Sequence, residues 1–442
     1  MSQTQPEMTF AATGDSFITR RLPAGDPDQA GIRALLERAQ VRFNNLEMTV
    51  HRFEDNDQVF PFAFSGGTWA GAPPQVLEDL KGYGFNLINW ANNHTMDYAY
   101  GGLAETARHL DAFGFVRAGA GASLREATAP AYLDCPGGRV ALVGATSSFH
   151  ESWMAGDPRP DCPGRPGVSF LRCVEEFVLP PRDFEQMKVV ACQTGINRSR
   201  EQMIREGFAL PDPEGRLVFG SHTFVRGEPG QKPGRVTRPH PKDAQRILEA
   251  VAEGCRQADY VLVSLHSHQL GQGRKDCPDG FLVDFAHQCI DAGAHAVIGH
   301  GPHILRGVEV YRERPIFYSL GNFIFQSETV PVLPRDFYEK YGLEGDGYPG
   351  QALRRRSRDG QVGLACDPQV WESVIPLWRM REGRLTELTF TPIQLGFGRP
   401  PHAMGWPRTG EDPAVLHRLA QLSQAFGTSI QVEGLTARWT AE

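Results

Sequence analysis

The sequence predicts an α/β protein whose sheet is covered by helices on both faces. Two observations support this class. Short apolar, β-branched runs alternate with amphipathic stretches over residues 8–145, and the alternation resumes over residues 242–298. This alternation is typical of βαβ units, whose strands are buried on both faces. In addition, a chain of 442 residues with 40% apolar and 22% charged residues is long enough to bury a full core.

The elements of the N-terminal part follow from apolar runs and the turn residues that close them. Residues 8–13 form an apolar run closed by Gly14, and Gly and Asn end later runs in the same way. The stretches between the runs have helical periodicity. We therefore expect strands at 8–13, 41–46, 85–89, near 116 and at 140–145, and helices at 26–38, 73–83 and 101–113.

The alternation stops between residues 149 and 240, where the sequence is rich in proline and glycine and suggests one helix, at 198–207. A connection this long inside a compact domain is more often a functional lid than an idle loop. We therefore predict a lid insertion at residues 149–240.

The elements predicted after residue 240 suggest that the chain has two parts. We expect helices at 242–257, 281–292 and 413–426, and strands at 260–265, 296–298, 372–380 and 385–392. We predict a catalytic domain over residues 1–330 and a C-terminal extension, 331–442, that packs on the same domain.

Polar side chains follow the strands of this predicted sheet. His300 and His303, for example, lie on a Gly-Pro corner directly after the buried run at 296–298. Loops at the carboxyl ends of parallel strands meet at one edge of a sheet and carry function. Mixed carboxylate, amide and imidazole groups suit a divalent cation better than a structural zinc site, which favours thiolates. The complete set is Asp15, Glu47, Asn93, His94, His266, His268, His300 and His303.

Composition excludes several classes of function. The net charge of −7 argues against general nucleic-acid binding. The N-terminus lacks the features of a signal peptide, and no apolar run approaches the roughly 20 residues that span a bilayer, so we expect a cytoplasmic protein without membrane contact. The eight cysteines form no C-x-x-C pair. No GxGxxG nucleotide motif is present, so we expect no organic cofactor.

The motifs GDSF, NNLE, ANNHTMD and GHGPH, followed by YSLGNFIF, resemble the CapA or poly-γ-glutamate capsule-synthesis family over roughly residues 10–326. The resemblance implies a calcineurin-like metallophosphatase fold, a two-sheet β-sandwich flanked by helices that holds metal at the strand ends. It also implies that His94 is the acid/base histidine. The metal-site positions that it implies are Asp15, Glu47, Asn93, His266, His300 and His303.

Two departures from the family pattern affect the expected metal content. Asp15-Ser16-Phe17 stands where the superfold has an Asp-x-His pair, and His266-Ser267-His268-Gln269 stands where many CapA-like chains have His-Trp-Gly before a glutamate. We therefore expect one divalent ion rather than two, with Ca²⁺ favoured and Mg²⁺, Mn²⁺ or Zn²⁺ as alternatives.

The histidines offer acid/base chemistry near neutral pH. If residues 93–98 turn helically, Asp97 can orient His94, although Asp97 could instead cap the helix that follows. A second pair could form between Asp15 and either His300 or His266. We predict His94, Asp97, His300 and Asp15 as the catalytic residues.

The leading functional prediction comes from resemblance to one subgroup of this family, the lasso-peptide epimerases, which invert the C-terminal residue of a ribosomal precursor peptide. Two His/Asp pairs would move the Cα proton of a residue, here expected to be aromatic, between its two faces. Metal-dependent hydrolysis of phosphoesters, γ-glutamyl bonds or peptide bonds is the main alternative, and a non-catalytic assembly factor is a third.

The expected partner is a peptide substrate, and nothing in the sequence indicates an oligomeric state. Arginines and lysines can bind a peptide carboxylate and tryptophans can stack on an aromatic residue, although surface solvation and core packing are their ordinary roles. The substrate-binding candidates are Arg20, Arg165, Arg274 and Trp90, with Arg21, Lys275, Trp69 and Trp153 as further candidates.

Overall fold

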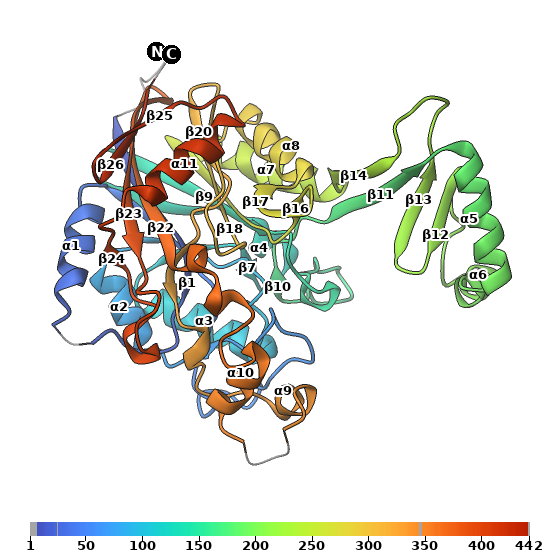
Figure 1. The fold of residues 1–442 in the computed structure, drawn as a ribbon, viewed down its shortest axis with the longest axis horizontal. Helices are drawn as coiled ribbons and strands as arrows, with labels where there is room; N and C mark the ends of the chain where they lie inside the picture. The colour runs from blue at the N-terminus through green and yellow to red at the C-terminus, as the bar shows by residue number, and fades with distance from the viewer. Residues whose placement is uncertain (1–6, 24, 344–346, 441–442) are drawn as a thin grey trace.

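The computed structural model describes residues 7–23, 25–343 and 347–440. The first residue of the predicted catalytic domain, 1, and the last residue of the predicted C-terminal extension, 442, lie outside these ranges. It confirms the α/β class (Figure 1). Two large sheets form the body of the molecule. Within the described residues, ten strands belong to the first sheet: β1 (Met8–Phe17), β2 (Val41–Leu46), β5 (Leu87–Asn89), β6 (Val116–Ala118), β21 (Asn322–Phe325), β22 (Glu372–Arg381), β23 (Arg384–Gln394), β24 (Arg408–Thr409), β25 (Ile430–Glu433) and β26 (Thr436–Trp439).

The second sheet is a smaller, mostly parallel sheet. Its four inner strands, β20, β18, β15 and β9, run parallel, and an antiparallel strand closes each edge. Its strands, in the described part of the chain, are β8 (Ala131–Cys135), β9 (Gly138–Thr146), β15 (Tyr260–His266), β18 (Ala296–His300), β19 (Val308–Tyr311) and β20 (Arg314–Phe317).

One apolar core contains side chains from both sheets. Phe10 of β1 stacks on Trp378 of β22 with ring centroids 5.2 Å apart, and meets Tyr260 of the second sheet edge-on at 5.4 Å. Phe43 and Leu262 belong to the same core. Because aromatic rings of this size bury large apolar areas, this core holds the two sheets together.

Helices cover the outer faces of both sheets. Three of them pack on the first sheet through a second core: α1 (Pro27–Leu36), α2 (Val76–Gly82) and α3 (Ala99–Ala112). Two pack on the second sheet through a third core: α7 (Pro241–Gln257) and α8 (Gly280–Asp291). The strands are thus buried on both faces, which explains why their sequences read as continuous apolar runs. No helix in the described part of the chain has the length and apolarity needed to cross a membrane.

Strand β1 runs four residues beyond its predicted end. Gly14 was expected to close the strand, but β1 continues to Phe17 and pairs there with β21. A Cβ on Gly14 would lie 1.9 Å from the carbonyl oxygen of Gly321, so the glycine allows close approach of two strands rather than a turn. As a result, Asp15 lies within a strand.

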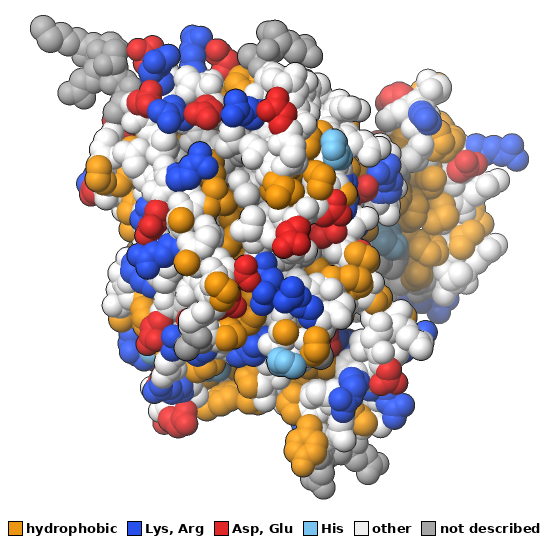
Figure 2. Space-filling view, turned by 60° about the vertical axis from the view of Figure 1, so that its left-hand side comes forward, with side chains coloured by type: hydrophobic (Ala, Val, Ile, Leu, Met, Phe, Trp, Pro, Cys, Tyr) orange, Lys and Arg blue, Asp and Glu red, His pale blue; other side chains and the backbone are white. Residues whose placement is uncertain are grey.

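Of the segment expected as a lid, residues 173–239 form a folded arm that projects from the body, on the right in Figure 1 and in Figure 2. The residues before 173 stay with the body, where Gly167 and Val168 pair with Gly121 and Ala120. The arm contains a four-stranded sheet and two helices where we had expected a loop with one helix. Proline at the first position of α5 is compatible with a helix start. Whether the arm acts as a lid stays a prediction. Its elements are β11 (Cys173–Leu179), β12 (Arg216–Phe219), β13 (His222–Arg226), β14 (Gly234–Pro239), α5 (Pro181–Thr194) and α6 (Arg198–Arg205).

The residues after 330 continue the same body. The predicted strands at 372–380 and 385–392 are present as β22 and β23, which extend the first sheet beside β1. The predicted helix at 413–426 is present as α11 (Ala414–Gln424), whose Leu416 and Leu419 enter the core between the sheets. Helices α9 (Arg335–Lys340) and α10 (Pro349–Ser357) lie at the end of the body that is lowest in Figure 1.

Candidate metal centre

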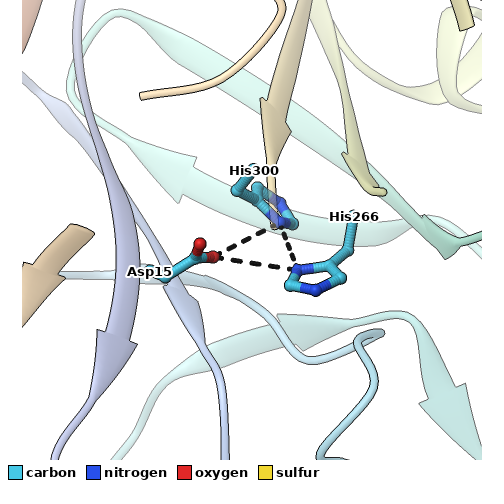
Figure 3. A group of neighbouring side chains, drawn as sticks. All are labelled: Asp15, His266 and His300. Atoms are coloured by element: carbon cyan, nitrogen blue, oxygen red, sulfur yellow. Dashed lines mark hydrogen bonds and ion pairs between the residues drawn. The ribbon is translucent and has the colours of Figure 1, made fainter. Parts of the chain in front are cut away.

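The strand ends of the two sheets bring six potential ligands together. Among the described residues, Asp15, His266 and His300 form one group, shown in Figure 3, and Glu47, His268 and His303 form another. Within each group the ligand atoms lie within 4.8 Å of one another. Asp15 and Glu47 come from the first sheet, whereas the histidines come from the second sheet and the loops after it.

The two groups adjoin. The Oδ1 atom of Asp15 lies 3.7 Å from Nδ1 of both His266 and His300. Across the groups, Oδ2 of Asp15 lies 3.7 Å from Nδ1 of His303, and Nε2 of His266 lies 3.7 Å from Oε1 of Glu47. The six side chains therefore form one continuous cluster, which we call the metal centre.

Asp15 is held in place by the local irregularity of its strand. The register between β1 and β2 shifts between Ala12 and Asp15. The amide of Asn45 then donates to Oδ1 of Asp15 at 2.7 Å, and the backbone N–H of Gly301 donates to Oδ2 at 3.0 Å. Asn89 donates to Oδ1 of Asn45 at 2.7 Å, which fixes the orientation of the Asn45 amide.

Two histidines of the centre also contact polar side chains that are not among the six ligands. His300 lies 2.6 Å from the hydroxyl of Ser264, and Nδ1 of His303 lies 2.9 Å from Oδ1 of Asn322. Partners of this kind fix the ring orientation of ligating imidazoles. His303 has a positive φ of 60°, a conformation that costs free energy for a residue with a side chain.

His94 and Asp97 form a buried pair beside the metal centre. Nδ1 of His94 lies 2.7 Å from Oδ2 of Asp97. The carboxylate also accepts the backbone N–H groups of Gly66 at 3.0 Å and Ala70 at 2.7 Å. Our alternative, that Asp97 caps a helix, is wrong, because the N-cap of α3 is Tyr98, which makes no side-chain capping bond.

Burial dominates the electrostatics of the centre. It raises the pKa of Asp15 to about 7, despite hydrogen bonds from Asn45 and Gly301 that lower it. Burial, followed by the charges of Asp15 and Asp97, raises the pKa of Glu47 well above its usual value. Burial also lowers the pKa of His300 and His303 to about 3. The imidazoles are thus neutral, which is the form that binds metal.

The donor set fits a divalent cation. Both carboxylate oxygens of Glu47 and the Oδ1 atom of Asn93 are buried and have no hydrogen-bond partner among the described residues. Such atoms are costly to bury unless something positive lies against them. A divalent cation would supply this positive charge, and four neutral imidazoles with two carboxylates can bind one. A nitrogen-rich ligand set of this kind suits Zn²⁺, Mn²⁺ or Fe²⁺ better than Ca²⁺ or Mg²⁺.

Two cavities reach the centre. The first, which we call the reaction pocket, measures about 250 Å³ and extends to His94 and His303 between Phe17 and Phe325. The second measures about 340 Å³ and extends to Asn93 and His268. Gly66 lines both cavities. A Cβ on Gly66 would lie 2.6 Å from the Asn93 amide, so only glycine fits this close above the site.

The four main substrate-binding candidates, Arg20, Arg165, Arg274 and Trp90, do not line either cavity. Trp90 is buried and its indole N–H donates to the carbonyl of Met48 at 3.0 Å. Arg20 donates to the carbonyl of Met404, Arg165 donates to that of Met154, and Arg274 pairs with Asp276. Of the further candidates, Trp153 lines the second cavity and Arg21 pairs with Glu78 and Asp79.

Several residues of the site were absent from our predicted set of ligands and catalytic groups. His268 belongs to the polar residues that follow the predicted strands but not to the metal-site positions that the resemblance implies, although its spacing from His266 is a usable signal, because alternate residues of an extended chain point to the same side. Asn45 and Asn89 precede strand ends in the motifs NNLE and INW, but their role as hydrogen-bond partners depends on pairing between strands.

Comparisons with known proteins agree on the kind of chain this is. The family described as Bacterial capsule synthesis protein PGA_cap matches residues 9–327. An uncharacterized protein of Sinorhizobium fredii, y4sH, is 34% identical over 96% of this chain and 91% of its own length. The capsule biosynthesis protein CapA of Bacillus anthracis is 23% identical over 58% of this chain and 43% of its own length. A probable polyglutamine synthesis accessory protein of Mycobacterium tuberculosis is 28% identical over 54% of this chain and 45% of its own length.

Proposed function

Because the chain belongs to the PGA_cap family of bacterial capsule synthesis proteins, we propose that it is a metal-dependent hydrolase that cleaves an amide bond in a glutamyl peptide. The observation that carries this proposal is the adjacency of the two ligand groups. The names of its relatives, which refer to capsule and polyglutamine synthesis, support a glutamyl peptide as substrate.

The metal ligands in this proposal are Asp15, His266 and His300 in one group and Glu47, His268 and His303 in the other, with Asn93 as a further oxygen donor. A divalent cation held there would polarise the scissile carbonyl and lower the pKa of water. The nitrogen-rich set makes Zn²⁺ or Mn²⁺ our proposal in place of Ca²⁺. Two adjoining groups leave room for a second ion as well as the one expected from the sequence.

The His94–Asp97 pair supplies the proton transfer in this proposal. Asp97 receives two backbone N–H groups and the Nδ1 side of His94, so the imidazole is held with its other nitrogen available to the reaction pocket. A histidine positioned in this way can protonate the leaving amine as the amide bond breaks. Positioned acid catalysis of this kind contributes about 10²-fold to 10⁴-fold in rate.

Epimerisation of a peptide Cα remains a second candidate because the site holds two His/Asp pairs. One is His94 with Asp97, and the other is Asp15 with His266 or His300 at 3.7 Å. Inversion at Cα needs one group to remove the proton and another to return it on the opposite face.

One experiment separates the two candidates. The protein is incubated with α-linked and γ-linked glutamyl peptides and with Zn²⁺ or Mn²⁺ in deuterated water, and the products are weighed by mass spectrometry. Shortened peptides that form only with metal are the result expected for hydrolysis. Peptides of unchanged length that gain about one mass unit would instead indicate exchange at Cα and contradict hydrolysis.

A further inference from the structure

A cavity of about 430 Å³ lies beside the reaction pocket, and nothing in the hydrolysis described above requires it. We propose that this cavity, which we call the apolar chamber, binds a large apolar side chain of the peptide substrate. The proposal rests on the proposed function for the nature of the substrate, but the chamber itself is argued from its walls.

The chamber and the reaction pocket share a wall. Four residues line both cavities: Phe325, Glu328, Ser357 and Ala365. The ring of Phe325 lies 5.3 Å from the ring of His303 on one side and 5.5 Å from that of Trp371 on the other. A single aromatic side chain therefore stands between a potential metal ligand and the chamber, so the chamber adjoins the site where a peptide in the reaction pocket would be held.

The walls of the chamber are suited to an apolar group. Leu353, Trp371 and Met404 line it together with Phe325. Burying a side chain of the size of Leu or Phe against such walls removes apolar area from water and therefore favours binding. The volume lies within the range of about 300–1,000 Å³ typical of cavities that bind small molecules.

The charges around the chamber disfavour a glutamyl side chain. Its charged lining residues are Glu328, Arg354 and Asp359, two acids and one base. Glu328 is paired with Arg356 at 3.1 Å, and the remaining charged residues, Arg354 and Asp359, are opposite in sign. The lining therefore offers no net positive charge to offset the burial of a second carboxylate, whereas an apolar group needs none.

The chamber is built by the part of the chain that follows the family region. The PGA_cap match ends at residue 327, and most of the chamber lining comes later, from segments at 328–329, 350–371 and Met404. Helix α10 and the loop after it, which has positive φ at Arg358, Asp359 and Gly360, form one of its walls. The chamber is thus a specificity element added to the shared catalytic region.

Binding of matched peptides tests the chamber without relying on turnover. The probes are glutamyl tripeptides that carry Gly, Leu or Phe at one position, with the position varied along the peptide. Affinities are measured by calorimetry on the full chain in the presence of a metal chelator, so no cleavage takes place. At one position, the Leu and Phe peptides are expected to bind at least about tenfold more tightly than the Gly peptide.

Ala365→Trp tests whether the advantage comes from this chamber. Ala365 lines both cavities, so an indole there is expected to abolish the preference for the Leu and Phe peptides over the Gly peptide. Ala30→Trp, the same substitution at an exposed position of α1, is the control and is expected to keep the preference. If Ala365→Trp fails to fold, Met404→Ser serves the same purpose, because a hydroxyl replaces an apolar wall.

The outcomes separate this inference from the proposed function. Equal affinities for the Gly, Leu and Phe peptides at every position would contradict the binding of an apolar side chain in the chamber, even if the protein cleaves all of these peptides. A preference for Leu and Phe that Ala365→Trp abolishes would establish the chamber as the binding site of the apolar side chain, even if no peptide is cleaved when metal is restored. A preference that survives both chamber substitutions would place the apolar group elsewhere and also overturn the inference.

Discussion

Glu47 is a fully buried carboxylate, and neither of its oxygens has a hydrogen-bond donor among the described residues. A bound cation would offset the cost of that burial, and without one the carboxylate destabilises the fold. Glutamine has nearly the same shape and no charge. The substitution Glu47→Gln therefore separates the role of the carboxylate as a ligand from its role in packing.

We expect Glu47→Gln to bind Zn²⁺ or Mn²⁺ at least about tenfold more weakly, because one anionic ligand is lost. The thermal midpoint of the metal-free protein should not fall, because burial already favours the neutral form of Glu47 and glutamine is neutral and of nearly the same shape. Thermal unfolding with and without added metal measures both effects. A variant with the same metal-induced increase in midpoint as the wild type would show that Glu47 is not a ligand.

His94→Gln and Asp97→Asn should lower kcat for peptide cleavage by about 10²-fold to 10⁴-fold and leave the metal content unchanged. The double variant should be little worse than either single variant, because the two side chains act as a unit. His109→Gln is the matched control, since His109 pairs with Asp55 at 3.3 Å near the surface. Loss of metal from either site variant would contradict a role in proton transfer.

At the scale of single residues, the sequence indicated which side chains lie together in the metal centre but not which hydrogen bonds orient them. Asp15, Glu47, His266, His300 and His303 follow apolar runs, and the parallel connectivity brings such ends together. The contacts that orient them, such as Asn45 to Asp15, depend on the register between strands. Register is set by packing across the whole sheet, so a local motif could not reveal it.

At the scale of the element, the approach of β1 to β21 is the feature that places Asp15. The two strands run so close at Gly14 that the carbonyl of Gly321 occupies the space of a side chain, and the N–H of Asp15 donates to that carbonyl at 2.9 Å. Any side chain at position 14 would force the strands apart and move Asp15 with them.

We expect Gly14→Ala to lower the free energy of unfolding by about 3 kcal/mol or more, because the overlap is with backbone that cannot move freely. Gly31→Ala is the matched control: Gly31 is exposed in α1, and its Cβ would be 3.8 Å from the nearest atom outside the helix. That variant should gain up to about 1 kcal/mol. Denaturant unfolding of both variants measures the difference, and equal stabilities would contradict the close approach.

The arm shows where prediction of elements from sequence fails. The Pro- and Gly-rich stretches at 157–166 and 227–233 indicated a loop, and both lie outside helices and strands, yet the residues between and directly after them form the helices and strands of the arm. The strands β12 and β13 are only partly buried, and β13 carries polar residues on both faces. Their pairing comes from tertiary contact rather than from a clear alternation of apolar residues.

At the scale of the whole molecule, the arm is joined to the body by β11 and β14, which are paired from Cys173 with Pro239 to Val178 with Gly234. Near the body, Arg235 pairs with Asp279 at 2.7 Å and Thr237 also donates to that carboxylate. Asp279 caps α8, so the base of the arm is part of the body's own structure. The rest of the arm can be removed without disturbing these contacts.

Replacing residues 179–233 with a two-residue Asn-Gly turn would join the paired residues Val178 and Gly234 directly. We expect the shortened protein to fold and to bind metal with unchanged affinity, because the metal centre lies in the body. If the arm acts as a lid, cleavage of long peptides should change while cleavage of dipeptides does not. Equal rates on all peptides would remove the lid hypothesis.

The metal centre has a mechanical consequence for the molecule. Its carboxylates lie in or directly after strands of one sheet, and its imidazoles lie at or after strand ends of the other, so an ion bound there would add a link between two layers that pack mainly through apolar side chains. Such an ion would act as a reversible cross-link that resists shear between the layers. Chelation should then speed amide hydrogen exchange in β1 and β15 together, while α5 in the arm exchanges at an unchanged rate.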